Sequence, residues 1–157
     1  MTYQQMIEIF KGVADDLCPA PLNFLYDRVW AMNGVPSITY PAMLVESQPN
    51  FNLDKFQHNN RAGLQIFKGK IFFFDLYQTD ERATKVAYIK QSELNELMHK
   101  ILAECKKRFD DAGVVITWGE GFFGQDVHNA KLVEVFVPYT VSMQNACTLG
   151  DFTSCHV

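Results

Sequence analysis

The sequence predicts an α+β fold in which a mostly antiparallel β-sheet carries two amphipathic helices packed on one face. Strand-like segments follow one another along the chain instead of alternating with helices. Two segments, at the N-terminus and at residues 86–109, repeat their apolar side chains at helical spacing. We therefore expect a single α+β domain over residues 1–146, followed by a C-terminal tail at residues 147–157.

The first predicted helix covers residues 2–17. Thr2, followed three residues later by Gln5, fits a capping box. The stretch CPAP ends the helix because proline cannot continue it. The apolar positions that recur at helical spacing are Tyr3, Met6, Ile7, Phe10, Val13, Ala14 and Leu17.

Two strands are predicted next, at residues 22–31 and 38–47, with a turn at NGVPS between them. Residues 48–63 are mostly polar, with Asn, Pro and Gly, and are interpreted as a loop or a long hairpin arm. The strongest strand signal follows at residues 63–78.

The clearest helical pattern lies at residues 86–109, and Gly113 suits its C-terminal cap. We expect its apolar stripe to pack on the sheet face that carries Phe72, Phe74 and Leu76. The stripe consists of Leu94, Leu97, Met98, Ile101, Leu102, Cys105 and Phe109.

The last two predicted strands are VVITW, at residues 114–118, and residues 131–143. Alternation in the second strand places one set of apolar side chains on a single face. The set is Val133, Val135, Val137, Tyr139, Val141 and Met143.

Composition excludes several classes of protein. The net charge is −4 and the isoelectric point is near 5.5, so a general affinity for nucleic acid or anionic membranes is not expected. The N-terminus lacks the pattern of a signal peptide, and no apolar run is long enough to span a membrane. We expect a cytosolic protein whose four cysteines are free thiols.

The stretch WGEGFFGQD spells G-x-G-x-x-G with Gly119, Gly121 and Gly124. A dinucleotide site needs a helix directly after this loop, because the helix N-terminus holds the pyrophosphate. Here a short polar stretch and then a strand pattern follow. We interpret the motif as a flexible hairpin connection between two strands.

Asp75 lies inside the most apolar strand, where a carboxylate could serve catalysis or bind a metal. No second carboxylate or basic residue shows a matching pattern, so we expect Asp75 to be exposed, to bind a loop or to contact a neighbouring subunit.

No motif indicates a metal, a cofactor or a nucleophile. Four side chains near the C-terminus could supply zinc ligands, but their spacing is not that of structural zinc sites. There is no G-x-S-x-G, Cys18 has no nearby histidine, and His58 and His99 are isolated. We expect no enzymatic activity and no cofactor. The zinc candidates are His128, Cys147, Cys155 and His156.

Four segments stand out in the order of the chain: ITYPAMLVE, KIFFFDLYQTDE, SELNELMHKILAECKKRF and AKLVEVFVPYTVSM. Together they resemble neck and tail-completion proteins of tailed bacteriophages, especially tail-terminator-like proteins. The resemblance is one of organisation and covers most of the chain. It implies a non-enzymatic virion protein that forms a homo-oligomeric ring, sixfold or a multiple, between the capsid connector and the tail. It also implies assembly in the bacterial host cytoplasm and passage of DNA through the channel without specific binding, which an acidic wall would favour.

Ring contacts are expected from loop 48–63, the connection 78–85 and the tail. These polar segments carry isolated side chains that a neighbouring copy could bury or pair with. The candidates are Phe51, Phe56, Asp80, Glu81 and Phe152. Two alternatives remain: a small carboxylate-dependent enzyme that uses Asp75, and a small-ligand binding domain with an aromatic-lined pocket.

Overall fold

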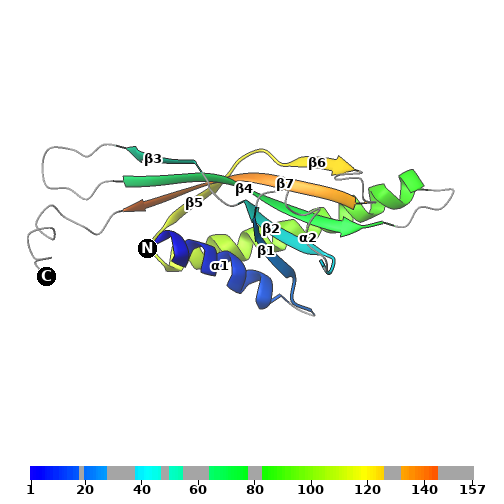
Figure 1. Cartoon of the computed structure of the whole chain (residues 1–157), viewed down its shortest axis with the longest axis horizontal. Coiled ribbons are helices and arrows are strands. Elements are labelled where there is room, and N and C mark those ends of the chain that lie inside the picture. The colour runs from blue at the N-terminus through cyan, green and yellow to red at the C-terminus, as the bar shows by residue number, and fades with distance from the viewer. Residues whose placement is uncertain are drawn as a thin grey trace, which may run out of the picture.

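The fold is an α+β fold with a mostly antiparallel sheet and two helices, as the sequence predicts. Helix α1 (Tyr3–Asp15) and helix α2 (Ala83–Asp111) both lie on one side of the sheet (Figure 1). The computed structural model describes residues 1–17, 20–27, 38–46, 50–54, 64–77, 83–125 and 132–144.

The described sheet has seven strands in the order β1-β2-β4-β7-β5, with β3 also on β4 and β6 also on β7. Strands β4 and β7 have 13 residues each and pair antiparallel from end to end, so they form the centre of the sheet. The strands are β1 (Asn23–Asp27), β2 (Ala42–Glu46), β3 (Asn50–Asp54), β4 (Leu64–Leu76), β5 (Val115–Trp118), β6 (Phe122–Gln125) and β7 (Leu132–Gln144).

Strands β1 and β2 pair in parallel, with Asn23 opposite Ala42. Parallel neighbours cannot be joined by a tight hairpin. The turn predicted at NGVPS falls within residues 28–37, which lie outside the described residues.

Strand β3 agrees with the hairpin-arm alternative for part of residues 48–63. Residues 50–54 pair antiparallel with β4, and Phe51 lies opposite Phe67. Their sequence, NFNLD, alternates polar and apolar residues as a strand does. The low strand propensity of Asn and Asp hides this alternation.

Helix α1 begins as the capping box predicts. The Thr2 hydroxyl accepts from the Gln5 amide at 3.2 Å, and the Gln5 side chain accepts from the Thr2 amide at 2.7 Å. The buried face of α1 packs into the core between the sheet and α2 and consists of Met6, Phe10, Val13 and Ala14.

Helix α2 is longer than predicted and ends at Asp111, with Gly113 in its C-terminal cap as expected from the sequence. Gly113 has a φ of 69°, a conformation that side-chain-bearing residues rarely adopt. Its amide donates to the Asp110 carbonyl and the Val114 amide donates to the Phe109 carbonyl, both at 2.9 Å. This is the Schellman arrangement that satisfies the last carbonyls of a helix.

The apolar stripe of α2 does not pack on the face predicted for it. Leu94, Met98 and Ile101 share one core with Ile71 and Phe73 of β4. That core also contains all six alternating apolar side chains predicted to share a face of β7. Strand β4 is apolar on both faces, so its alternation could not reveal which face the helices cover.

The predicted face of β4 lies on the opposite side of the sheet. Phe72 and Phe74 form a second, smaller cluster with Leu44, while Leu76 is exposed. Phe72 and Phe74 of β4 stack with ring centroids 6.0 Å apart, and Phe72 makes a tilted contact with Phe136 of β7 at 5.3 Å. The sheet thus has a large core under the helices and an aromatic cluster on its other face.

Candidate functional site

The glycine motif forms a β-bulge in an edge strand. Strand β5 pairs with β7 from Ser142 to Tyr139, and β6 continues along the same side of β7 from Phe136 to Val133. Residues 119–121 therefore lie opposite only two residues of β7, which is the signature of a bulge. The strand VVITW does pair antiparallel with β7, as a hairpin requires. Residues 119–125 are not part of the connection, however, because β5 and β6 are two halves of one interrupted edge strand.

Pro138 explains where the interruption occurs. Proline has no amide hydrogen and cannot complete the ladder, whereas its carbonyl accepts from the Gly119 amide at 2.8 Å. A Cβ on Gly119 would lie 3.2 Å from the Pro138 side chain, so glycine allows the close approach. The residues after Gly121 form β6, which leaves no helix N-terminus to hold a pyrophosphate.

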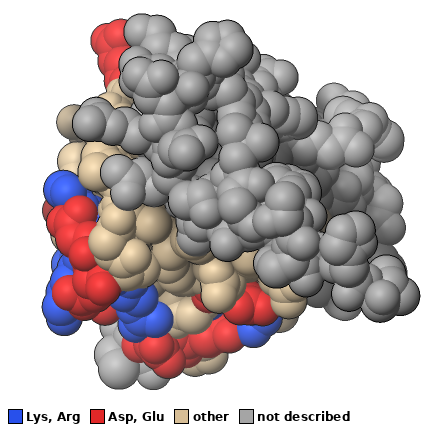
Figure 2. Space-filling model, turned by 90° about the vertical axis from the view of Figure 1, so that its left-hand side faces the viewer, with Lys and Arg blue, Asp and Glu red and all other residues tan. Residues whose placement is uncertain are grey.

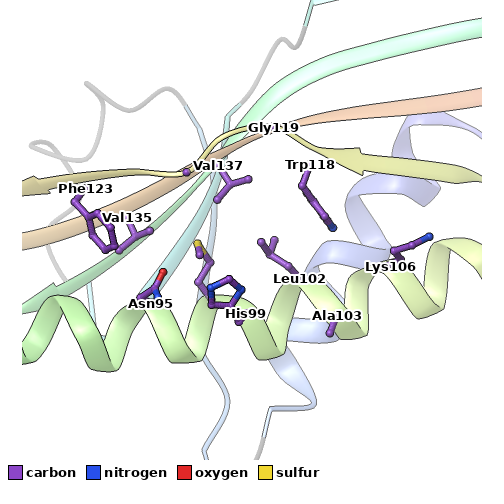
Figure 3. Close-up of a pocket in the computed structure, with 12 residues that line it drawn as sticks. Asn95, His99, Leu102, Ala103, Lys106, Trp118, Gly119, Phe123, Val135 and Val137 are labelled. Carbon is purple, nitrogen blue, oxygen red and sulfur yellow. The ribbon is translucent and has the colours of Figure 1, made fainter.

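A pocket of about 470 Å³ lies between α2 and this bulge (Figure 3). Figure 3 shows Trp118 and Val137 directed from the strands toward α2, with Trp118 and Phe123 at opposite ends of the space. The apolar lining includes Met98, Leu102, Trp118, Phe123, Val135 and Val137, and the bulge contributes Gly119 and Gly121.

The polar lining of the pocket contains basic and neutral groups. Asn95, His99 and Lys106 line it from α2, and no carboxylate is among the lining residues. Lys106 also binds both carboxylate oxygens of Asp110, at 3.0 and 2.9 Å. The pocket suits an apolar or aromatic group with a neighbouring negative charge, and it lacks the paired carboxylates of acid–base catalysis.

Strand β6 exposes two adjacent phenylalanines on opposite faces of the sheet. Phe123 is 60% exposed and lines the pocket. Phe122 is 46% exposed and stacks on Phe136, with ring centroids 5.0 Å apart. Val115 of β5 adds a third exposed apolar side chain, at 58%. We call Val115, Phe122 and Phe123 the exposed edge set.

Sequence reasoning missed the pocket, although it singled out several of its residues. From the sequence, the glycine motif is interpreted as a hairpin connection and His99 as an isolated histidine. The two meet only because α2 runs beneath β5 and β6. The signal available in the sequence was the aromatic pair Phe122 and Phe123 directly after the motif.

Asp75 has a basic partner that the sequence did not indicate. The Lys90 ammonium lies 3.4 Å from the Asp75 carboxylate, and the other carboxylate oxygen accepts from the Leu76 amide at 2.8 Å. Lys90 also pairs with Glu93 at 3.0 Å, and this hydrogen bond is the main cause that raises the pKa of Lys90. Asp75 thus anchors α2 to the end of β4, a role in stability.

Most of the predicted assembly contacts fall outside the described residues. Phe51 lies in β3, and its backbone pairs with β4. The remaining contacts, Phe56, Asp80, Glu81 and Phe152, are not described, and neither are Cys18, His58, His128, Cys147, Cys155 and His156.

Cys105 is a buried free cysteine in the α2 stripe. Burial raises the pKa of its thiol to about 12, so it is a neutral, apolar side chain at physiological pH. Within the described ranges, no group of three or more His, Cys, Asp or Glu side chains could hold a metal ion.

Neither described helix is long and apolar enough to cross a membrane. No protein-family model matches the chain, and the comparison with curated proteins finds no match. The arguments about function therefore rest on the geometry and on the resemblance in organisation.

Proposed function

We propose that the chain is a non-enzymatic structural subunit of the head–tail junction of a tailed bacteriophage. Identical copies assemble into a closed ring, sixfold or a multiple, that joins the capsid connector to the tail. The resemblance of its segments to tail-terminator-like proteins supplies the class, and the geometry of the sheet edge supports assembly.

The observation that carries the proposal is the β5–β6 edge. Its outer side has no partner strand among the described residues, and it carries the exposed edge set within two four-residue strands. An edge strand with exposed apolar side chains is prone to pair with another chain. Covering one such side chain contributes roughly 1.5–3 kcal/mol before ordering costs.

The two ends of the described sheet differ, so a contact between one end and the other joins unlike surfaces. Strand β1 ends the order on one side and the bulged strand ends it on the other. A contact that joins unlike surfaces is heterologous, and such contacts close into rings when the rotation permits. DNA then passes through the channel without specific binding, and the site of action is the virion.

The test is the native mass of the purified full-length chain over a range of concentrations, alone and with particles that lack it. We expect a discrete oligomer and negative-stain images of rings. Val115→Ser combined with Phe122→Ser should shift the mass toward the monomer. Tyr88→Ser is the comparison variant, since Tyr88 is a 72% exposed aromatic side chain that belongs to α2 and not to β5 or β6. A chain that stays monomeric under every condition, with particles present, contradicts the proposal.

The pocket favours a second candidate, a small-ligand binding domain. Its volume of about 470 Å³ lies within the range of roughly 300–1,000 Å³ that is typical of ligand sites. Titration of the full chain with small aromatic acids, followed by Trp118 fluorescence, tests this reading. Saturable binding to a chain that never assembles would favour it over the ring.

A further inference from the structure

We infer that the pocket between α2 and the β5–β6 bulge receives Phe152 from the C-terminal tail of a neighbouring copy. Residues 145–157, which include the tail, follow β7 and lie outside the described residues. The inference rests on the proposed function in one respect, since the donor is another copy in the assembly. It assigns a role to the pocket and to the one aromatic side chain of the tail.

The shape and lining of the pocket fit an aromatic side chain. Met98, Leu102 and Val135 are buried apolar side chains of the lining, and Trp118 and Phe123 stand at opposite ends (Figure 3). Phe123 is 60% exposed, so an incoming ring would cover apolar surface that now faces water. Aromatic rings also favour stacked and edge-to-face contacts with one another.

The charges of the pocket and the tail are complementary. Lys106 and His99 line the pocket without any carboxylate, whereas Asp151 directly precedes Phe152 and the tail contains no Lys or Arg. Lys106 now pairs with Asp110, but both side chains are about half exposed. Such surface pairs contribute little, so Lys106 can exchange Asp110 for an incoming carboxylate at small cost.

The direction of β7 favours a neighbouring copy as the donor. Strand β7 passes the pocket at Val135 and Val137 and ends at Gln144, beyond the start of β5 (Figure 1). From Val137 to Gln144 the strand advances seven residues, which takes the chain about 23 Å from its own pocket at ~3.3 Å per residue. Phe152 lies eight residues beyond Gln144, and eight almost fully extended residues span roughly 27 Å. To bring Phe152 back to the pocket of its own copy, the chain would have to reverse its direction directly after Gln144.

A tail-into-pocket contact joins two unlike surfaces and is therefore heterologous. Repeated from copy to copy, it generates a closed ring or an open filament, as the rotation dictates. The contact would also bring Asp151 of one copy close to Lys106 and His99 in the pocket of the next copy.

The experiment uses a synthetic peptide of residues 145–157, kept reduced, and a full-length receptor that carries Phe152→Ser and Trp30→Phe. Trp118 is then the only tryptophan, because the chain has two. We expect a saturable change in Trp118 fluorescence. A peptide with Phe152→Ser should bind at least about tenfold more weakly, a difference of 1.4 kcal/mol. A peptide with Asp151→Asn should bind several-fold more weakly.

Two receptor variants form a matched pair. Phe123→Ser should abolish binding, because its ring lines the pocket, whereas Phe122→Ser should bind like the parent receptor. The two residues are adjacent and both exposed, but they lie on opposite faces of the sheet. The inference is overturned if the peptide shows no saturable binding, or if both variants weaken it equally.

Native mass separates this inference from the proposed function. Rings that persist in the Phe152→Ser chain, together with a peptide that does not bind, would overturn the pocket contact and leave the ring. Peptide binding by a chain that never forms rings would sustain the pocket and overturn the ring. A chain that carries only Trp30→Phe, with its Phe152 intact, and whose Trp118 signal equals that of the peptide complex at every dilution would show the tail in its own pocket and overturn the neighbour as donor.

Discussion

At the scale of single residues, Gly69 and Tyr139 show how closely the two central strands depend on each other. Gly69 of β4 lies opposite Tyr139 of β7, whose ring covers it. A Cβ at position 69 would lie 2.6 Å from the Tyr139 hydroxyl oxygen and 2.7 Å from Cζ. No residue with a side chain fits there unless Tyr139 moves.

Gly69→Ala should therefore destabilise the fold by ~1–3 kcal/mol, the usual cost of overpacking a core. Urea unfolding measures the loss. In a double-mutant cycle, Tyr139→Leu should recover part of it, because the shorter side chain vacates the space above position 69. A loss below about half a kcal/mol would mean that the ring is not packed there.

Glu134 is a buried acid on the face of the sheet away from the helices. Burial raises the pKa of its carboxyl, and the positive charge of Lys70 opposes the shift. An acid with a raised folded-state pKa stabilises the fold below its ordinary pKa of about 4.5, and this contribution is lost as pH rises through the folded value.

Glu134→Gln should thus be more stable than the wild type at pH 7. The difference should shrink as the pH falls from the raised folded-state pKa to about 4.5, and it should stay constant at lower pH. Denaturant unfolding of both proteins at several pH values measures the difference. An equal difference in the free energy of unfolding at all pH values would show that Glu134 does not titrate as a buried acid.

At the scale of elements, α2 depends on the part of its stripe that faces the core. Ile101 is fully buried, and Leu97 is only partly buried against the same core. Ile101→Ala should cost ~2–5 kcal/mol and Leu97→Ala clearly less. Thermal or urea unfolding of both variants measures the contrast. Equal, small losses at the two positions would mean that the stripe does not face the core.

The bulge makes a second prediction at this scale. Neither Gly119 nor Gly121 has a positive φ, so alanine is allowed at both. The nearest side chain to a Cβ would be 3.2 Å away at Gly119 and 3.5 Å away at Gly121. Gly121→Ala should leave stability unchanged within about half a kcal/mol, with Gly119→Ala more costly. Melting temperatures of the two variants measure the contrast. A larger loss for Gly121→Ala than for Gly119→Ala would contradict the position of Pro138 in the bulge.

Local patterns predicted most elements, and long-range pairing explains what they missed. The cap at Thr2, the stripe of α2 and the alternation of β7 are local and were confirmed. The helix-covered face of β4 and the Asp75–Lys90 pair depend on elements far apart in sequence. The pocket has the same origin, because His99 and Phe123 meet only in the folded chain.

At the scale of the whole molecule, surface charge does not form a field of one sign on the face drawn in Figure 2. Acidic and basic side chains alternate over its lower part, where the helices lie. Among the described residues, Lys106 pairs with Asp110 and Arg108 with Glu104 at i,i+4 spacing. An acidic channel wall, as the net charge of −4 suggested, must be sought on another face.

The most direct test of the central claim is the position of the chain in assembled particles. The chain is expressed with a small epitope tag in cells that produce the phage encoding it, and the particles are labelled with gold-conjugated antibody for electron microscopy. The account predicts label at one place in each particle, the junction of head and tail, and particles with unjoined heads and tails when the gene is deleted. Particles without label, or a deletion that leaves joining intact, would contradict it.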